Sequence, residues 1–535
     1  MTRVGIFGWG VIAPACPDID TFAEKLQEDG SWLSAFDGFG PSTFLTGQPS
    51  FDFADYRPWI EARFAPTKFP QLQQKMGNTT LYAIGAFIQA LGQNPGIEKT
   101  LQDLASKAHV LIGTGVGDLP TQYGCSLALY HAQRRWDRFW AAAERNRDRD
   151  QYEQADDDER QALAQQWEVP TDPRDLPDGA PQRDATEDAW FSFWMRRSEQ
   201  LPEYLEAFEA IEAAGIKGDI NADKLRIIRR KRSAFTKLQK QWQCPTPPWM
   251  SVAPNLIWNI ANTPAAQVSM LGKITGPACA PIAACSSFGV ALKLAMQAIR
   301  TGEAKVVVVG MADPPPHPML VAAFYRARVL SADRRPSMPL SNLRGTHISG
   351  GACIWIVGDH EFMRKQGYRP LGLEIIGVGV TSDAEHIITP TKEGPLEAIR
   401  LALQAAGIEA SDLGTWDMHA TATPGDYQEI GTLQELVPDG LAVTARKGTF
   451  GHGMAVSGGW ELTAQHLGLT RGELYPTTIE AEALHPLIAT APFRFVLNAP
   501  CEAPPGVAGK LSMGIGGVNA CVISRRWEDG PKPTP

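Results

Sequence analysis

The stretch PIAACSSFGVALKLAMQAIRTGEAKVVVVGMAD, residues 281–313, contains the pattern that decides the fold. Its small residues at 281–286 predict a turn. Apolar residues then recur at helical spacing as far as Gly302, and four consecutive valines follow at 306–309. A helix that leads into a continuous apolar strand is typical of a sheet whose two faces are both covered by helices.

Apolar strands of the same kind recur on both sides of this stretch. RVGIFGWG (3–10), HVLIGTG (109–115) and ACIWIVGD (352–359) complete a first set. The last third repeats the grammar with LEIIGVGV (373–380), TWDMHAT (415–421), FRFVLNAP (493–500), KLSMGIGG (510–517) and ACVISRR (520–526), again with helical patterns between. We predict an α/β fold with a parallel sheet and an internal duplication.

Residues 121–245 break this alternation, because they are rich in Arg, Asp, Glu, Gln and Trp. We predict a charged, mainly helical insertion, ordered by its six tryptophans. The expected organisation is a first half at 1–120 plus 246–365, the insertion, a second half at 366–527 and a disordered tail at 528–535.

Composition excludes several classes of protein. A net charge of −9 over 535 residues argues against a general nucleic-acid binder. The N-terminus MTRVGIFGWGVIAPA predicts a buried strand in place of a signal peptide, and no apolar run is long enough to span a bilayer. The eight cysteines are scattered without a CxxC pair, so we predict free thiols in a cytoplasmic protein and no metal site.

Cys285 stands where the turn enters the predicted helix. A thiol at the positive end of a helix dipole is stabilised as the thiolate, so the position suits a nucleophile with a lowered pKa. The dipole contributes only about 0.3–1 kcal/mol, so nearby histidines would have to supply the rest. A lone cysteine at such a position more commonly packs as a small apolar residue.

Two histidines and a glycine-rich loop follow in the second half. His419 begins HATATPGDYQE (419–429), His452 lies in KGTFGHGMAVSG (447–458), and SMGIGGVN (512–519) joins two predicted strands. Each motif alone is more often structural than functional.

Taken together and in this order, the motifs resemble those of the β-ketoacyl synthases of the thiolase superfamily. AACSSFG (283–289) is similar to the family's nucleophile turn, and GIGGVN (514–519) to its C-terminal glycine loop. The segment at 447–458 matches the family's KxxxGHxxxxxG pattern, and the segment at 419–429 is similar to its HGTGTxxGDxxE pattern. The resemblance implies a duplicated αβαβα five-layer fold and covers the chain apart from the insertion and tail.

The resemblance also implies roles for individual residues. Cys285 would carry the acyl group, the backbone amides of Cys285 and Ile515 would form an oxyanion hole, and His419 and His452 would bind the malonyl thioester carbonyl. Lys447 and Glu429 would form a supporting ion pair. Thr421 and Thr423 would bind phosphopantetheine, and Ile515 with Met513 would form the gate.

The chain departs from the family's pattern at several of these positions. Ala420 and Ala422 replace the glycines that usually follow the first histidine, and Ile515 replaces the gating aromatic residue. The loop GTHISGGA (345–352) carries His347 and Gly350 in place of an acidic residue. These changes put the substrate preference in question, whereas the Cys-His-His set and the lysine are retained.

The implied activity is an acyltransferase reaction, the decarboxylative Claisen condensation of acyl-Cys285 with malonyl-acyl carrier protein, in fatty-acid or polyketide biosynthesis. The enzyme itself would hold no cofactor, since phosphopantetheine of a carrier protein or CoA brings the substrates. A homodimer is expected. The basic residues Arg229, Arg230, Lys231 and Arg232 are a possible docking patch for an acidic carrier, or a solvated helix face. Two alternatives stay open: a transacylase that uses Cys285, and a non-catalytic partner subunit.

Overall fold

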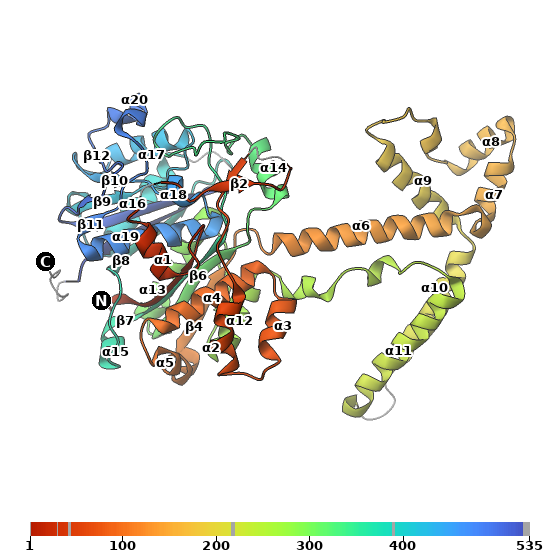
Figure 1. The fold of residues 1–535 in the computed structure, drawn as a ribbon, viewed down its shortest axis with the longest axis horizontal. Coiled ribbons are helices and arrows are strands. Elements are labelled where there is room, and N and C mark those ends of the chain that lie inside the picture. Colours follow the sequence, from red (N-terminus) through yellow and green to blue (C-terminus); the bar gives the residue numbers. More distant parts are fainter. Residues whose placement is uncertain (1, 29, 41–43, 216–219, 388–390, 528–535) are drawn as a thin grey trace. The chain divides into compact units, whose positions relative to one another are not determined.

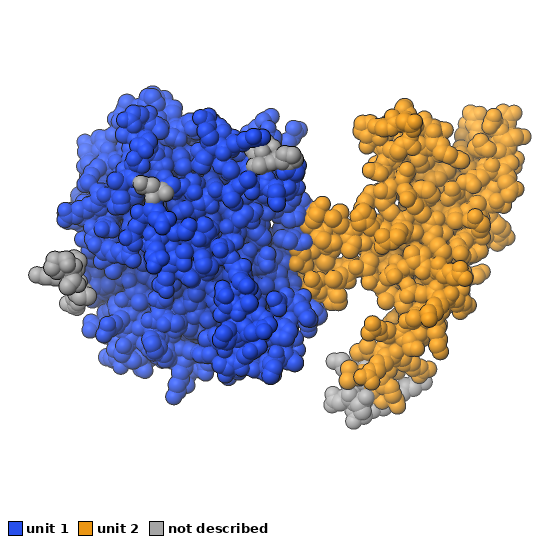
Figure 2. All heavy atoms as spheres, in the orientation of Figure 1, with its two compact units in different colours: residues 1–120, 257–535 blue, residues 121–256 orange. Residues whose placement is uncertain are grey.

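The computed structural model describes residues 2–28, 30–40, 44–215, 220–387 and 391–527. The chain forms two compact units, residues 1–120 with 257–535, and residues 121–256 (Figure 2). The predicted disordered tail, 528–535, lies outside the described residues.

Within the described residues, the larger unit contains an eleven-stranded sheet of order β12-β10-β9-β14-β15-β8-β1-β7-β6-β4-β5 (Figure 1). Its strands are β1 Val4–Ile12, β4 Ala108–Gly113, β5 Ala278–Cys279, β6 Val306–Asp313, β7 Gly351–Asp359, β8 Glu374–Ser382, β9 Leu413–Asp417, β10 Ala442–Thr444, β12 Arg494–Phe495, β14 Val507–Gly514 and β15 Val518–Arg525. Two small antiparallel pairs lie apart from it: β2 Ser34–Phe36 with β3 Phe44–Thr46, and β11 Glu473–Leu474 with β13 Cys501–Glu502.

The sheet consists of two halves with the same internal plan, which confirms the predicted duplication. From the centre outward, β1-β7-β6-β4-β5 and β8-β15-β14-β9-β10 each have two antiparallel pairings followed by two parallel ones. The halves meet at one residue pair, Val4 with Ile375.

Helices cover both faces of each half of the sheet, and two of them lie between the halves. The larger unit contains α1 Ile19–Lys25, α2 Arg57–Glu61, α3 Lys68–Lys75, α4 Asn78–Gly92, α5 Ile97–Asp103, α12 Thr263–Gly272, α13 Ser287–Arg300, α14 Pro318–Arg326, α15 His360–Lys365, α16 Glu393–Ala406, α17 Gly425–Gln434, α18 Lys447–Phe450, α19 Ser457–Arg471 and α20 Pro486–Ala489. Helices α4 and α12 pack on the first half, and α16 packs on the second. Between the halves, α13 contacts β6 and β8, and α19 contacts β7 and β9.

The alternation of side chains along the strands shows these layers directly. In β7, Cys353, Trp355 and Val357 join the central hydrophobic core around α13 and α19, whereas Ala352, Ile354 and Ile356 join the outer core under α4. Because a strand points successive side chains to opposite faces, both faces are buried. The five-layer α/β architecture is therefore the predicted one.

The predicted parallel sheet is correct only in part. The outer pairings of each half are parallel, whereas β7 and β15 run antiparallel to both of their neighbours. A continuous apolar run indicates that both faces of a strand are buried, and this says nothing about strand direction. Strands β10 and β12 are too short for the sequence pattern to define their bounds.

The smaller unit is helical and has two cores of its own. It contains most of α6 Leu119–Ala141, with α7 Arg147–Gln154, α8 Asp157–Trp167, α9 Arg183–Arg197, α10 Gln200–Glu212 and α11 Ile220–Trp242. Trp190 and Trp194 are buried in one core, and Trp136 and Trp140 in the other. The unit extends to Leu256, beyond the predicted end at residue 245, because Trp249 packs on Trp136.

Across the described residues, no helix is long and apolar enough to cross a membrane. In the same part of the chain, no three His, Cys, Asp or Glu side chains form a group that could hold a metal ion.

Candidate active site

The nucleophile candidate Cys285 lies in a short 3-10 turn, Ala284–Ser286, directly before α13. Ala284 takes the left-handed conformation (φ 47°), which turns the chain sharply into the helix. The buried Ser286 hydroxyl lies 3.0 Å from the carbonyl oxygen of Ser512 and 2.7 Å from that of Val518, and donates to them. This side chain therefore ties the cysteine turn to the β14–β15 hairpin, whose connection contains Ile515.

The Cys285 sulfur is enclosed, with 5% of the residue exposed. Burial raises the pKa of the thiol to about 11, although the Lys447 charge and the backbone amides of Ile515 and Cys285 pull it down. The prediction of a lowered thiol pKa is therefore wrong in sign, because the helix-dipole argument did not include desolvation. The two amides that face the sulfur are donors suited to an oxyanion beside it.

His419 follows β9 and is held by two buried charged residues. Glu429 accepts the backbone N–H of His419 at 2.8 Å and that of Ala420 at 2.9 Å. The Lys447 ammonium donates to the His419 carbonyl at 2.5 Å and lies 3.3 Å from Nδ1. Since an ammonium can only donate, Nδ1 is the acceptor and the ring proton is on Nε2.

His452 lies between α18 and the 3-10 turn Met454–Val456, and its tautomer is fixed in the same way. Its Nδ1 accepts the backbone N–H of Met454 at 3.0 Å and lies 3.1 Å from the Ser457 hydroxyl. Its own backbone N–H donates to the His347 carbonyl at 2.6 Å. The backbone carbonyl of His347, which lies in the loop that departs from the family's pattern, thus supports the second histidine.

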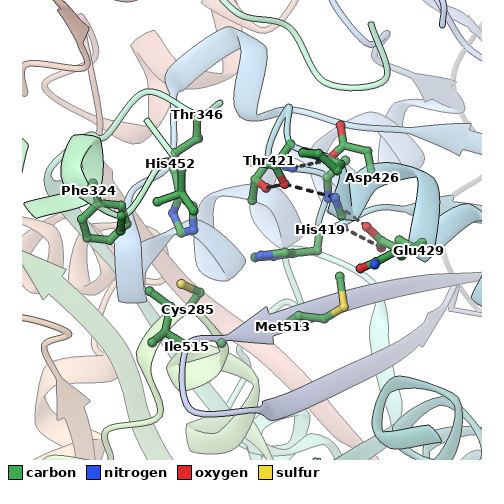
Figure 3. Close-up of a pocket in the computed structure, with 18 of the residues that line it drawn as sticks. Cys285, Phe324, Thr346, His419, Thr421, Asp426, Glu429, His452, Met513 and Ile515 are labelled. Atoms are coloured by element: carbon green, nitrogen blue, oxygen red, sulfur yellow. Dashed lines mark hydrogen bonds between the residues drawn. The ribbon is translucent and has the colours of Figure 1, made fainter. Parts of the chain in front are cut away.

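The two imidazoles stand nearly perpendicular, with ring centroids 5.7 Å apart. Burial, the Lys447 charge and the Lys510 charge lower the pKa of both rings well below the usual value. Both histidines are therefore neutral, and each has an Nε2–H to donate. Figure 3 shows the two rings and the Cys285 sulfur directed into one space.

The predicted ion pair between Lys447 and Glu429 is replaced by another pairing. Lys447 binds Glu461 at 2.5 Å, and both side chains are at most 1% exposed. Glu429 is occupied by the two backbone amides, and burial raises its pKa to about 7. Glu461 was missed because it lies three residues beyond the His452 motif, which ends at Gly458, and before the glycine loop. A lone carboxylate within the otherwise uncharged first turns of α19 was the available signal.

The cavity in front of Cys285 has a volume of about 480 Å³ and is lined by both histidines. Thr421 and Thr423 lie in its wall with their hydroxyls 2.9 Å apart, and Met513 and Ile515 line it from the glycine loop. Phe324 and the exposed Arg328 also line it, and sequence reasoning missed both. Buried Asp426, another omission, accepts the backbone N–H groups of Thr421 and Ala422.

The proposed docking patch lies on α11 in the smaller unit. Arg229, Arg230 and Arg232 are exposed, and Lys231 pairs with Glu212 at 3.0 Å. These residues are not part of the cavity wall.

The alanines that replace the family's glycines differ in backbone conformation, and this gives a stability prediction. Ala422 has φ 60°, where a side chain costs about 1–2 kcal/mol, whereas Ala420 lies outside that region. Both residues are buried, so removing either methyl loses similar packing. We expect Ala422→Gly to be more stable than Ala420→Gly by about 1 kcal/mol or more in urea unfolding. Equal stabilities would show that no backbone strain resides at Ala422.

The comparisons with known proteins agree with the predicted fold and family. The fold places the chain in the thiolase-like α/β class. The family descriptions "Beta-ketoacyl synthase, N-terminal domain" and "Beta-ketoacyl synthase, C-terminal domain" match residues 197–357 and 373–480, together half of the chain. The chain belongs to the β-ketoacyl synthase family.

Curated relatives match part of the chain. A "3-oxoacyl-[acyl-carrier-protein] synthase 2" of Rhizobium meliloti (strain 1021) is 30% identical over 279 residues, which are 50% of this chain and 65% of the relative. "Nodulation protein E" of Rhizobium meliloti is 28% identical over 49% of this chain and 65% of its own length. The match thus spans less than two thirds of these relatives.

Solved structures share the fold over nearly the whole chain. "The ishigamide ketosynthase/chain length factor" is 18% identical with a TM-score of 0.66, and covers 98% of this chain and 99% of its own. A β-ketoacyl synthase from Burkholderia phymatum STM815 has the same identity and TM-score, and covers 99% of this chain and 100% of its own.

Proposed function

We propose that this protein is a β-ketoacyl synthase that condenses an acyl group on Cys285 with a malonyl group on acyl carrier protein, releasing CO₂. One observation carries the proposal: a buried thiol faces two backbone amides, and two neutral imidazoles with Nε2–H donors line the same cavity. The arrangement supplies both a nucleophile and a separate pair of donors for an enolate oxygen.

The first half-reaction is an exchange between thioesters. The Cys285 sulfur attacks the carbonyl carbon of the acyl thioester, and the amides of Cys285 and Ile515 donate to the oxyanion. When the intermediate collapses, the bond to the phosphopantetheine sulfur breaks. The departing thiolate takes up a proton equivalent to the one that Cys285 loses, so the exchange needs no net proton. The neutral resting thiol is compatible with this balance.

The second half-reaction uses the histidines. The Nε2–H groups of His419 and His452 donate to the malonyl thioester carbonyl while the bond to the carboxylate breaks and CO₂ leaves. The electron pair becomes an enolate, whose carbon attacks the acyl carbon on Cys285. Cys285 leaves as a thiolate and takes one proton from solvent, which restores the neutral thiol. Cys285, His419 and His452 are buried, which limits the access of water to the carbanion.

The mouth of the cavity fits a phosphopantetheine arm. Thr421 and Thr423 offer hydroxyls for its amides, and Ile515, 43% exposed, with Met513 forms the proposed gate. No group is proposed as a resident cofactor. Arg328 stands exposed at the wall, where its charge can meet the phosphate of the arm.

Two charge reversals distinguish recognition of the phosphopantetheine arm from recognition of the carrier protein. Arg328→Glu is expected to raise KM about tenfold for both acyl-CoA and acyl-carrier substrates, because both have the phosphate. Reversal of Arg229 and Arg230 is expected to raise KM several-fold for the carrier-bound substrate alone, in a salt-dependent way, if the α11 patch docks the carrier. No change from the second pair across a salt titration would leave α11 as a solvated face.

A homodimer through the β5 edge is also proposed. Among the residues that the structure describes, strand β5 pairs with β4 alone. Both residues of β5 are exposed, and Ile282 follows with 53% exposed. Ile257 and Met270 in the same unit are also more than half exposed. An unpaired edge beside apolar side chains favours association with a second copy. Sedimentation of the purified chain as a monomer would contradict this.

A further inference from the structure

A second buried lysine, Lys510, lies beside the condensing centre and takes no part in the steps described so far. It lies on β14 with 1% of its side chain exposed. Its ammonium binds Glu461 at 2.9 Å and donates to the carbonyl of Leu511 at 2.5 Å. It also lies 3.4 Å from the carbonyl oxygen of Met418, the residue before His419.

These contacts connect three segments of the chain, each of which positions a residue of the active site. Strand β14 leads into the glycine loop with Ile515, Met418 leads into His419, and Glu461 on α19 holds Lys447. Replacement of Lys510 would therefore act on the site through residues that touch it.

Lys510 shares its nearest carboxylate with Lys447. Glu461 is shared by two ammonium groups, Lys447 on Oε1 and Lys510 on Oε2, and all three side chains are at most 1% exposed. Asp417 is paired with Arg446 at 2.6 Å, and Glu429 is occupied by backbone amides. The triad by itself has two positive charges and one negative charge, and the nearby Asp417 and Glu429 carboxylates also favour the Lys510 ammonium. Burying a second ammonium costs several kcal/mol. The three carboxylates offset that cost, since the pKa of Lys510 is raised.

We propose that Lys510 is a positioning residue of the condensing centre, which shares Glu461 with Lys447 and places a second positive charge behind His419 and His452. The inference rests on the proposed function. The Lys510 charge stabilises the negative charge that develops on the thioester oxygen as CO₂ leaves, and it opposes protonation of the two imidazoles. Acylation of Cys285 depends on it less, because the oxyanion there is held by backbone amides.

The pKa directions agree with this arrangement. After burial, the Lys447 and Lys510 charges are among the causes that lower the pKa of His419 and of His452. Loss of the Lys510 charge therefore raises both pKa values, so the histidines protonate at a higher pH. The ionisable groups that surround them are Cys285, Asp313, Asp417, Asp426, Glu429, Arg446, Lys447, Glu461 and Lys510.

Two variants distinguish the effect of the Lys510 charge from the effect of its hydrogen bonds. Lys510→Met removes both, and Lys510→Gln keeps an N–H donor for the Met418 and Leu511 carbonyls. We expect both variants to lower malonyl decarboxylation about tenfold or more and to move the acid limb of its pH profile to higher pH. The rate of Cys285 acylation is expected to stay within about threefold. A Lys510→Gln variant with the wild-type profile would overturn the role of the charge.

Histidine titration tests the inference without any substrate. Selectively ¹⁵N-labelled histidines in the full chain, assigned with single-histidine variants, report the protonation of His419 and His452 directly. The titration of both is expected at higher pH in Lys510→Met and Lys510→Gln than in the wild type. Unchanged titration would refute the inference even if condensation is confirmed. The proposed function alone would be refuted if the wild-type chain does not decarboxylate malonyl substrates while the histidine titrations still move to higher pH in both Lys510 variants.

Discussion

Incubation of the purified chain with a panel of acyl thioesters is expected to add the mass of one acyl group, attached to Cys285. Its sulfur is the one that lies in the cavity with two histidines and two amide donors. Cys285→Ala is expected to abolish the adduct and to lower condensation by about 10³-fold or more. Intact-protein mass spectrometry followed by peptide mapping measures both the number and the position of the acyl groups.

Cys501 provides the control for simple thiol exposure. It is a partly exposed free thiol in β13 and does not line the cavity. Cys501→Ala should retain the adduct and the turnover. An adduct that follows Cys501, or one that survives in Cys285→Ala, would show that acylation reflects accessibility and would remove the proposed nucleophile.

His419→Ala and His452→Ala are each expected to slow decarboxylation of the malonyl substrate by about 10²–10³-fold, because each removes one donor from the enolate oxygen. Acylation of Cys285 should continue, since its oxyanion is held by backbone amides. Stopped reactions that quantify acyl-enzyme and released CO₂ separately show the two steps. Because both pKa values are lowered, the wild-type decarboxylation rate should not fall through histidine protonation between about pH 8 and 6.5.

His466 is the matched control for loss of a buried imidazole. It is fully buried in α19, its Nε2 lies 3.1 Å from the Ser524 hydroxyl, and it does not line the cavity. His466→Asn is expected to lower stability without separating the two steps. A parallel loss of acylation and decarboxylation in His419→Ala and His452→Ala would indicate that these histidines also have only a structural role.

The sequence predicted the three residues that meet at the cavity because their motifs have distinctive spacing. Cys285, His419 and His452 are far apart in the chain. The duplicated fold brings them together through the turn before α13, the end of β9 and the segment after α18. The same reasoning failed for charges. Glu461 and Lys510 lie outside the short motifs, so the partner of Lys447 was assigned to Glu429, the carboxylate within a motif.

Quantities that depend on burial and on backbone angles were beyond the sequence. The thiol of Cys285 was expected to have a lowered pKa from its helix position, and its enclosure reverses the shift. The strain at Ala422 depends on a single φ angle, which its neighbour Ala420 does not share. The prediction of strand direction failed in part, for a related reason. An apolar pattern indicates that a strand is buried and does not determine whether it runs parallel or antiparallel to its neighbours.

A single-turnover experiment tests the central claim most directly. Enzyme acylated at Cys285 is freed of excess donor and mixed with malonyl-acyl carrier protein, and CO₂, acyl-enzyme and carrier-bound product are quantified together. The account predicts one CO₂ and one β-ketoacyl-carrier for each acyl group lost from Cys285. Transfer of the acyl group to an acceptor without CO₂ release, or an acyl-enzyme that persists beside malonyl-carrier, would contradict it.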